Sequence, residues 1–286
     1  MSVTNRSIVF LTIAFAFSWA VAVGAHYAGL RESAPVTLIL FVMMAGPAVA
    51  ALVCAFAFER GRRVEAPGLR FRPNWCWLLA WLMPIALAAI SVIATILLSD
   101  RTYADAGAAA VAAAEAQGQD LSQVPPWLIG TPFIVTMSVL LGALINTPLL
   151  TFTEELGWRG YLHHLWRPSG FWRASLATGA VWGVWHAPAI FFYGLNYPDH
   201  AVLGIGLFTL YCMLLSPMLT LVRDRGGSVW AAGIFHGTVN AVGGLTIVMV
   251  SDPTFPWNGI VGIGGFIALA LGCALVLLLQ RKASAA

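Results

Sequence analysis

Residues 36–58 read VTLILFVMMAGPAVAALVCAFAF, a stretch without a charged side chain that is long enough to cross a lipid bilayer as one helix. The rest of the chain has the same character. Of its 286 residues, 59% are hydrophobic and only 9% are charged, whereas soluble domains carry about 25% charged residues. Such a chain cannot cover a globule with polar surface, so the sequence predicts a protein whose solvent is lipid.

Further apolar stretches of this length predict an all-α fold, a polytopic membrane helix bundle with about eight transmembrane helices. These lengths exclude a β-barrel, whose strands are about half as long and alternate in polarity. We expect a single transmembrane domain over residues 1–286, with a motif-bearing core at about 127–250. The expected spans lie at about 8–28, 36–58, 76–98, 127–150, 174–193, 202–222, 230–250 and 259–280.

The basic residues predict how the bundle is oriented. If the N-terminus is cytoplasmic and all the spans are real, every one of the 15 Lys and Arg residues except Arg31 and Arg101 falls on the cytoplasmic side. One missing or extra span would destroy this bias. We therefore expect both termini in the cytoplasm, in a multi-pass protein of a bacterial-type plasma membrane. An Ala-rich run at 104–116 then predicts a surface helix on the outside.

Ionisable side chains in or beside the spans are the candidates for function, because each is costly in lipid. They occur in three separate stretches of the chain. These are TFTEELGWRGYL at 151–162, WGVWH at 182–186 and HGTVN at 236–240. The alternative explanation is that such residues only join helices through hydrogen bonds.

Helical spacing assigns these side chains to faces. Residues four apart share a face, so Glu155 can pair with Arg159 within one helix, and His236 shares a face with Asn240. Glu154 points about 100° away from Glu155 on a regular helix. The two neighbouring carboxylates therefore need not share a role.

The depth of the candidates predicts that they meet. Counted at about 1.5 Å per helical residue from Arg167, Arg173 and Arg225, which are predicted to be cytoplasmic, the candidates lie roughly 16–23 Å into the bundle. These candidates are Glu154, His186, His236 and Asn240. If these residues only joined helices through hydrogen bonds, their depths would not be expected to match. We expect these side chains to converge in one polar cavity that opens towards the cytoplasm.

A cluster of this composition suits hydrolysis of an amide. A carboxylate in an apolar cavity can accept and return a proton, and a facing imidazole can hold the water that it deprotonates. A second imidazole with a neighbouring amide can donate hydrogen bonds to an oxyanion. A proton-coupled transporter that uses Glu154 and His186 as a relay is an alternative.

The three stretches together resemble the signature of a known family. EELGWRG at 154–160 is similar to the EExxxR motif of the CPBP family, which includes type II CAAX prenyl endopeptidases and bacteriocin-processing or self-immunity proteins and is also called the abortive-infection family. WGVWH at 182–186 resembles its FxxxH motif, with Trp where Phe is usual. HGTVN at 236–240 resembles its HxxxN motif. All three occur in the family's order.

The resemblance implies an eight-helix intramembrane endopeptidase acting on a membrane-associated or prenylated, CAAX-type peptide or protein. It implies that Glu154 and His186 activate the water, and that His236 and Asn240 stabilise the oxyanion. The expected partners are that substrate and membrane lipid, not nucleic acid. A non-catalytic immunity or binding protein of the same fold remains an alternative.

The resemblance also implies that Glu155 and Arg159 form a structural pair that orients the site. It leaves the use of a metal open, because members are described both as metalloproteases and as enzymes that use a glutamate and water. If Zn²⁺ is the cofactor, Glu154, His186 and His236 could supply three ligands with an open fourth position. We favour hydrolysis without a metal.

Overall fold

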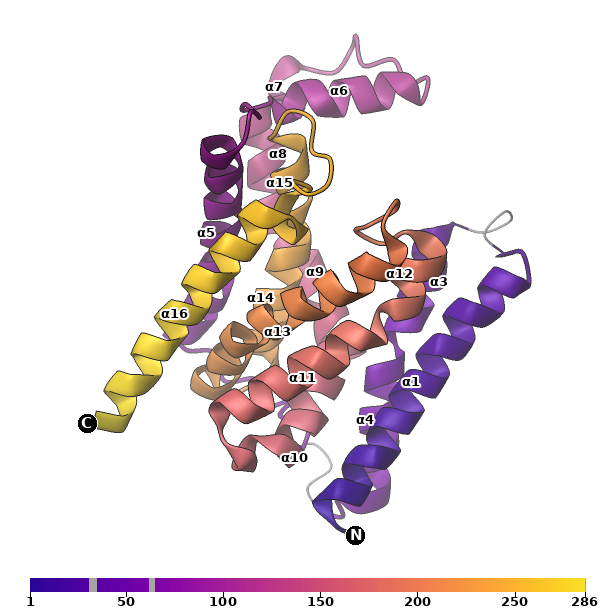
Figure 1. Cartoon of the computed structure of the whole chain (residues 1–286), viewed down its shortest axis with the longest axis vertical. Helices are drawn as coiled ribbons and strands as arrows, with labels where there is room; N and C mark the ends of the chain where they lie inside the picture. Colours follow the sequence, from indigo (N-terminus) through magenta and orange to yellow (C-terminus); the bar gives the residue numbers. More distant parts are fainter. Residues whose placement is uncertain (31–34, 62–64, 286) are drawn as a thin grey trace.

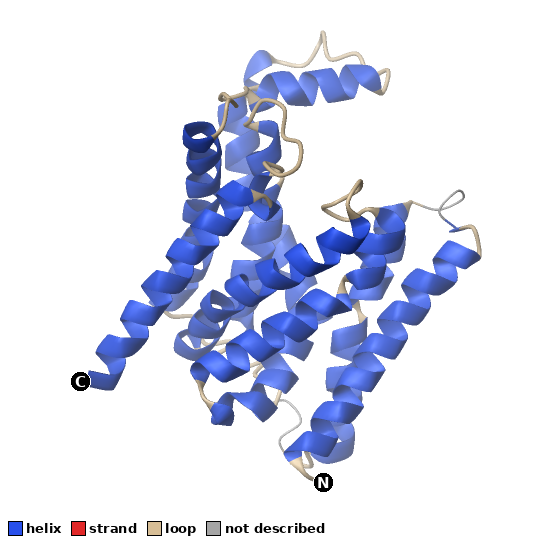
Figure 2. Ribbon diagram, viewed as in Figure 1, coloured by secondary structure: helices blue, strands red, loops and turns tan. Residues whose placement is uncertain are grey.

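The computed structural model describes residues 1–30, 35–61 and 65–285. Arg31, Arg62 and Arg63, which contribute to the charge-based prediction, lie outside these ranges, as does the side chain of Lys282. The described chain is a bundle of helices (Figures 1 and 2) and contains no strand beyond an isolated bridge between Tyr103 and Val250. The predicted all-α class is confirmed.

Seven helical segments are long and apolar enough to cross a membrane, and most have bounds close to those predicted. They are Val3–Tyr27 (α1), Val36–Phe58 (α3, Val36–Met44, and α4, Gly46–Phe58), Trp75–Leu98 (α5), Thr131–Ser169 (α8 to η3), Ala201–Gly226 (α13), Val229–Val248 (α14, Val229–Gly243, and α15, Leu245–Val248) and Ile263–Arg281 (within α16, Ile263–Ala285). The fifth predicted span is formed differently.

That span, expected at 174–193, consists of two shorter helices, α11 (Phe171–Trp185) and α12 (Ala187–Tyr193), which meet at His186. Pro188 explains the break, because it has no backbone N–H to donate to the preceding turn. Together the two helices carry the chain from the end of the bundle that holds the termini to the opposite end (Figure 1). With this passage the described chain runs the length of the bundle about eight times. Its N- and C-termini therefore lie at the same end of the bundle (Figure 1).

The fourth predicted span, 127–150, was wrong in its bounds, because the helix begins at Thr131 and continues to Ser169. It is built from α8 (Thr131–Met137), η1 (Ser138–Gly142), α9 (Ala143–Leu150), η2 (Thr151–Leu162), α10 (His163–Trp166) and η3 (Arg167–Ser169). η1 and η2 are π-helical, a wider coil that is rare in proteins and frequent at functional sites. The polar EELGWRG run therefore belongs to this helix and does not follow it.

The Ala-rich run forms a helix, α6 (Ala106–Ala116), as predicted. Asp105 caps its N-terminus by accepting a hydrogen bond from the Ala108 N–H at 2.8 Å. The same carboxylate accepts one from the Thr131 hydroxyl at 2.8 Å, which ties α6 to the start of α8. A short helix, α7 (Pro126–Ile129), completes this connection at the end of the bundle away from the termini (Figure 1).

Small residues allow α14 to lie directly against α9, which brings the HGTVN run next to the EELGWRG run. A Cβ atom on Gly237 would lie 2.7 Å from the Thr147 nitrogen and 2.8 Å from the Asn146 carbonyl carbon. Both distances are shorter than non-bonded contacts of a Cβ atom allow. The Asn146 amide donates a hydrogen bond to the Gly237 carbonyl at 3.3 Å. Asn146 is thus a contact between helices.

We predict that Gly237→Ala lowers the free energy of unfolding by about 1–3 kcal/mol, because the added methyl group meets backbone that cannot move aside cheaply. Thermal unfolding of the purified protein in detergent measures the effect. Gly206→Ala on α13 is the matched control, since no heavy atom lies within 4 Å of its added Cβ. Equal melting temperatures for the two variants would contradict this packing.

Candidate functional site

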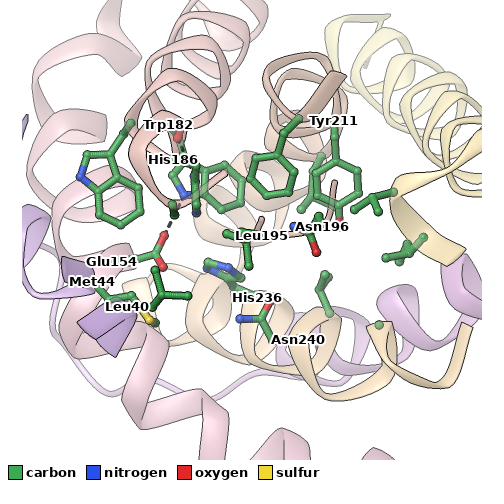
Figure 3. Close-up of a pocket in the computed structure, with 18 of the residues that line it drawn as sticks. Leu40, Met44, Glu154, Trp182, His186, Leu195, Asn196, Tyr211, His236 and Asn240 are labelled. Carbon is green, nitrogen blue, oxygen red and sulfur yellow. Dashed lines mark hydrogen bonds between the residues drawn. The ribbon is translucent and has the colours of Figure 1, made fainter. Parts of the chain in front are cut away.

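A cavity of about 440 Å³ opens inside the bundle, a volume that is usual for ligand pockets. Glu154, His186, His236 and Asn240 all line it. Figure 3 shows these side chains around one shared space, although they come from η2, the α11–α12 break and α14. The convergence expected from their depth is therefore present.

Glu154 enters the cavity from the first π-helical turns of η2, and its side chain is almost fully buried. The indole N–H of Trp182 on α11 donates to its Oε2 at 2.7 Å. A hydrogen bond to a carboxylate is short and strong, and it fixes the orientation of the group. Oε1 is thereby left for other contacts in the cavity.

His186 occupies the break between α11 and α12. Its Nδ1 lies 2.8 Å from the Trp182 carbonyl oxygen. A carbonyl only accepts, so Nδ1 carries the proton and Nε2 of the neutral ring is an acceptor. The indole of Trp19 on α1 donates to the Trp185 carbonyl at 3.1 Å, which satisfies a backbone group beside the break.

Glu155, next to Glu154, faces a different set of partners. Its Oε1 accepts hydrogen bonds from Arg159 Nη1 at 3.1 Å and from His236 Nδ1 at 2.8 Å. The relative exposures of the Glu155 and Arg159 side chains are 0% and 1%. The pair predicted from the four-residue spacing is present, and neither member is among the described residues that line the cavity.

Arg159 extends this contact to two further helices. Its Nη2 donates to the Ser216 hydroxyl on α13 at 3.2 Å, and its guanidinium carbon lies 4.5 Å from the centre of the Trp182 ring on α11. Its backbone carbonyl accepts from Arg223 Nε at 2.9 Å. The ion pair thus joins η2 to three surrounding helices.

His236 is the link between the buried ion pair and the cavity. Because Glu155 accepts at Nδ1, the opposite ring nitrogen, Nε2, is left for the cavity that the residue lines. Asn240 follows one turn later on α14, also lines the cavity and is exposed. The shared helical face of these two residues therefore faces the same space (Figure 3).

Glu154, His186 and His236 are the side chains from which a zinc site could be built. His186 and His236 each use Nδ1 for a protein contact, an arrangement that suits both metal-binding and water-binding imidazoles. Among the described residues, however, no three His, Cys, Asp or Glu side chains are grouped closely enough to hold a metal ion. Glu154, His186 and His236 do not form such a group, and hydrolysis without a metal stays a prediction.

Segments away from the termini complete the lining of the cavity. They contribute Leu40 and Met44 of α3, Leu195 and Asn196 after α12, and Asn258 before α16. These segments lie at the end of the bundle opposite the N- and C-termini (Figure 1). The sequence predicted cytoplasmic termini and a cytoplasmic mouth. The side of the membrane that each one faces stays a prediction.

Comparison with known proteins agrees with this site. Residues 134–242 match the family model described as Type II CAAX prenyl endopeptidase Rce1-like, over less than half of the chain. The matched segment contains all three motifs, and it confirms the family predicted from them. It supports a CAAX-type intramembrane protease in general. No curated protein matches the sequence.

Sequence reasoning missed several residues of the site. Trp182 was noted only as an aromatic residue of a motif, although an indole one turn before His186 is also a hydrogen-bond donor. Ser216, which supports Arg159, lies in an apolar helix and has no distinguishing pattern. Asn196 and Asn258 lie in loops, and only the fold brings them to the cavity.

We predict that Arg159→Leu destabilises the protein by about 3–5 kcal/mol, because it leaves the Glu155 carboxylate buried without its charge partner. Thermal unfolding in detergent measures this loss. Arg173→Leu is the control, since Arg173 is exposed and should cost at most about 0.5 kcal/mol. An Arg159→Leu protein as stable as the control would show that the pair contributes little.

Proposed function

We propose that the chain is an intramembrane endopeptidase that hydrolyses a peptide bond of a membrane-associated substrate with water held by Glu154 and His186. One observation carries the proposal: a carboxylate, two imidazoles and an amide from separate helical segments line one cavity inside an apolar bundle. The family match over residues 134–242 supports a peptide or protein as substrate. Whether that substrate is prenylated is decided by experiment.

In the proposed first step, Glu154 acts as the general base. Its Oε2 is held by the Trp182 N–H, so Oε1 accepts the proton from water. His186 accepts the second hydrogen bond of that water at Nε2, because its Nδ1–H is committed to the Trp182 carbonyl. The water oxygen then attacks the carbonyl carbon of the substrate.

His236 and Asn240 are proposed to stabilise the oxyanion that forms. The Asn240 amide donates directly. His236 donates from Nε2 when both of its ring nitrogens carry protons, and Glu155 at 2.8 Å supports that charge. With Glu154 and Glu155 ionised and Arg159 and His236 protonated, the charges at the site cancel, and donors fixed in a cavity stabilise developing charge strongly.

In the last proposed step the tetrahedral intermediate collapses. The carboxylic acid of Glu154 returns its proton to the amide nitrogen, and the carbon–nitrogen bond breaks. The hydroxyl from water stays on the carbonyl carbon, so the products are a carboxylic acid and an amine, and the acid then ionises by giving its proton to the amine. Glu155 and Arg159 touch neither product, and their proposed role is to position His236.

We predict that Glu154→Gln lowers the rate of peptide cleavage by about 10²–10⁴-fold, because the amide cannot take a proton from water. The measurement is hydrolysis of a membrane-associated peptide by purified protein, with thermal unfolding to confirm the fold. Glu115→Gln, an exposed change on α6, should cleave at the wild-type rate.

Three results would overturn the proposal. Cleavage at the wild-type rate by Glu154→Gln would show that Glu154 is not the general base. If the wild type cleaves nothing but confers immunity or binds a partner equally well in Glu154→Gln and His186→Ala, the protein is non-catalytic. Proton-driven flux that is lost in these variants would instead identify a transporter.

We predict that Trp182→Phe slows cleavage by about tenfold or more in protein that thermal unfolding shows to be folded. Phenylalanine keeps an aromatic ring against Arg159 but removes the donor to Glu154, and a hydrogen bond to a charged group contributes about 1.5–3 kcal/mol. Trp172→Phe at the other end of α11 is the control. Equal rates for the two variants would show that the Trp182 N–H does not orient the base.

A further inference from the structure

Tyr211 lines the cavity but has no part in the proposed chemistry. It lies on α13 with a relative exposure of 4%, and Figure 3 shows its ring reaching from that helix towards the shared space. Its hydroxyl makes no hydrogen bond with any residue that the structure describes. The hydroxyl is also not one of the fully buried atoms that lack a partner, so part of it remains accessible. It is therefore available to a ligand in the cavity.

A second buried tyrosine shows the usual arrangement. Tyr197, in the loop between α12 and α13, has a relative exposure of 1%, and its hydroxyl donates to the Val261 carbonyl at 2.7 Å. This bond ties the loop to the short helix η4 (Gly259–Val261). Buried tyrosine hydroxyls usually find such a partner. At position 211 a phenylalanine would pack equally well, so the hydroxyl of Tyr211 calls for an explanation other than the fold.

Aromatic contacts fix the place of Tyr211 in the cavity. Its ring stacks on that of Phe208, with centres 5.3 Å apart and planes within 17° of each other. Phe208 in turn packs edge-on against the His186 imidazole, with ring centres 4.8 Å apart. One ring thus separates Tyr211 from His186. The residue lies beside the proposed reaction centre and not within it.

A peptide held at the reaction centre would carry its neighbouring carbonyl groups past this wall. An extended peptide advances about 3.3 Å per residue, so a side chain one ring away from His186 can reach residues close to the scissile bond. Three side chains of α13 line the cavity, namely Phe208, Tyr211 and Leu215, and α13 is described throughout. Of these only Tyr211 can donate a hydrogen bond. A carbonyl that lost its water against this wall without a donor would be costly.

We propose that Tyr211 binds the substrate by donating a hydrogen bond from its hydroxyl to a backbone carbonyl beside the scissile bond. The identity of that ligand as a substrate rests on the proposed function. Because Tyr211 does not touch the reacting atoms, its contact is the same before and during the reaction. Such a contact lowers KM and leaves kcat unchanged.

Tyr211→Phe tests this role, since it keeps the ring on Phe208 and removes only the hydroxyl. On the membrane-associated peptide that is used for Glu154→Gln, KM should rise about three- to tenfold, the effect of losing one uncharged hydrogen bond. The value of kcat should stay within about twofold. The melting temperature should not fall, because the hydroxyl has no partner among the described residues. An unchanged KM, or a loss confined to kcat, would overturn the proposal.

Tyr197→Phe is the matched control. It removes a hydroxyl that bonds to the Val261 carbonyl, so it should lower the melting temperature. Its KM should stay within about twofold of the wild-type value, because that hydroxyl is already engaged within the protein. If Tyr211→Phe lost stability and kept its KM in the same way, the Tyr211 hydroxyl would be structural and the proposal wrong.

A thioamide scan tests the contact without requiring hydrolysis. The same peptide, labelled with a fluorophore, is made in versions that each carry sulfur, a weaker acceptor, in place of one carbonyl oxygen. Fluorescence anisotropy then measures the dissociation constant of each version for Glu154→Gln protein with and without Tyr211→Phe. With Tyr211 present, one version should bind about threefold or more weakly than the others. Without the hydroxyl, that version should lose nothing further, because the same bond is already absent.

Equal losses in the two proteins, or no binding by either, would overturn the assignment of Tyr211. The proposed function fails on a different result. If the thioamide scan shows the coupling to Tyr211 but the wild type does not cleave the peptide, the binding site stands and the hydrolysis does not.

Discussion

The buried carboxylate of Glu155 is the group on which the rest of the site depends. In lipid, a polar group that finds no partner within the protein costs several kcal/mol, so a buried charge must be met by other helices. Glu155 is met by Arg159 on its own helix and by His236 on α14, and Arg159 in turn contacts α11 and α13. One ion pair thus sets the relative positions of the helices that carry the cavity.

Glu154 can act in chemistry because Glu155 does not share its surroundings. The two neighbours leave the π-helical backbone in different directions, so one carboxylate is locked in an ion pair while the other reaches the cavity. The break at His186 has a similar effect, since it frees the residue from a regular helix and turns its Nδ1 to the Trp182 carbonyl. Local departures from regular helix therefore create the proposed catalytic arrangement.

The sequence was sufficient for the features that depend on hydropathy and helical spacing. It predicted the spans, the Glu155–Arg159 pair and the convergence of Glu154, His186, His236 and Asn240. It could not place the end of the fourth span, because hydropathy falls at 154–160 while the helix continues to Ser169 with its charges paired internally.

The central claim is that Glu154 and His186 handle the same water molecule. A double-mutant cycle measures this directly, with kcat of Glu154→Gln, His186→Ala and the double variant determined on one peptide. Groups that act as one unit are not additive, so the double variant should be about as slow as the slower single variant. If the two losses multiply instead, the residues act independently, and the account of a shared water is wrong.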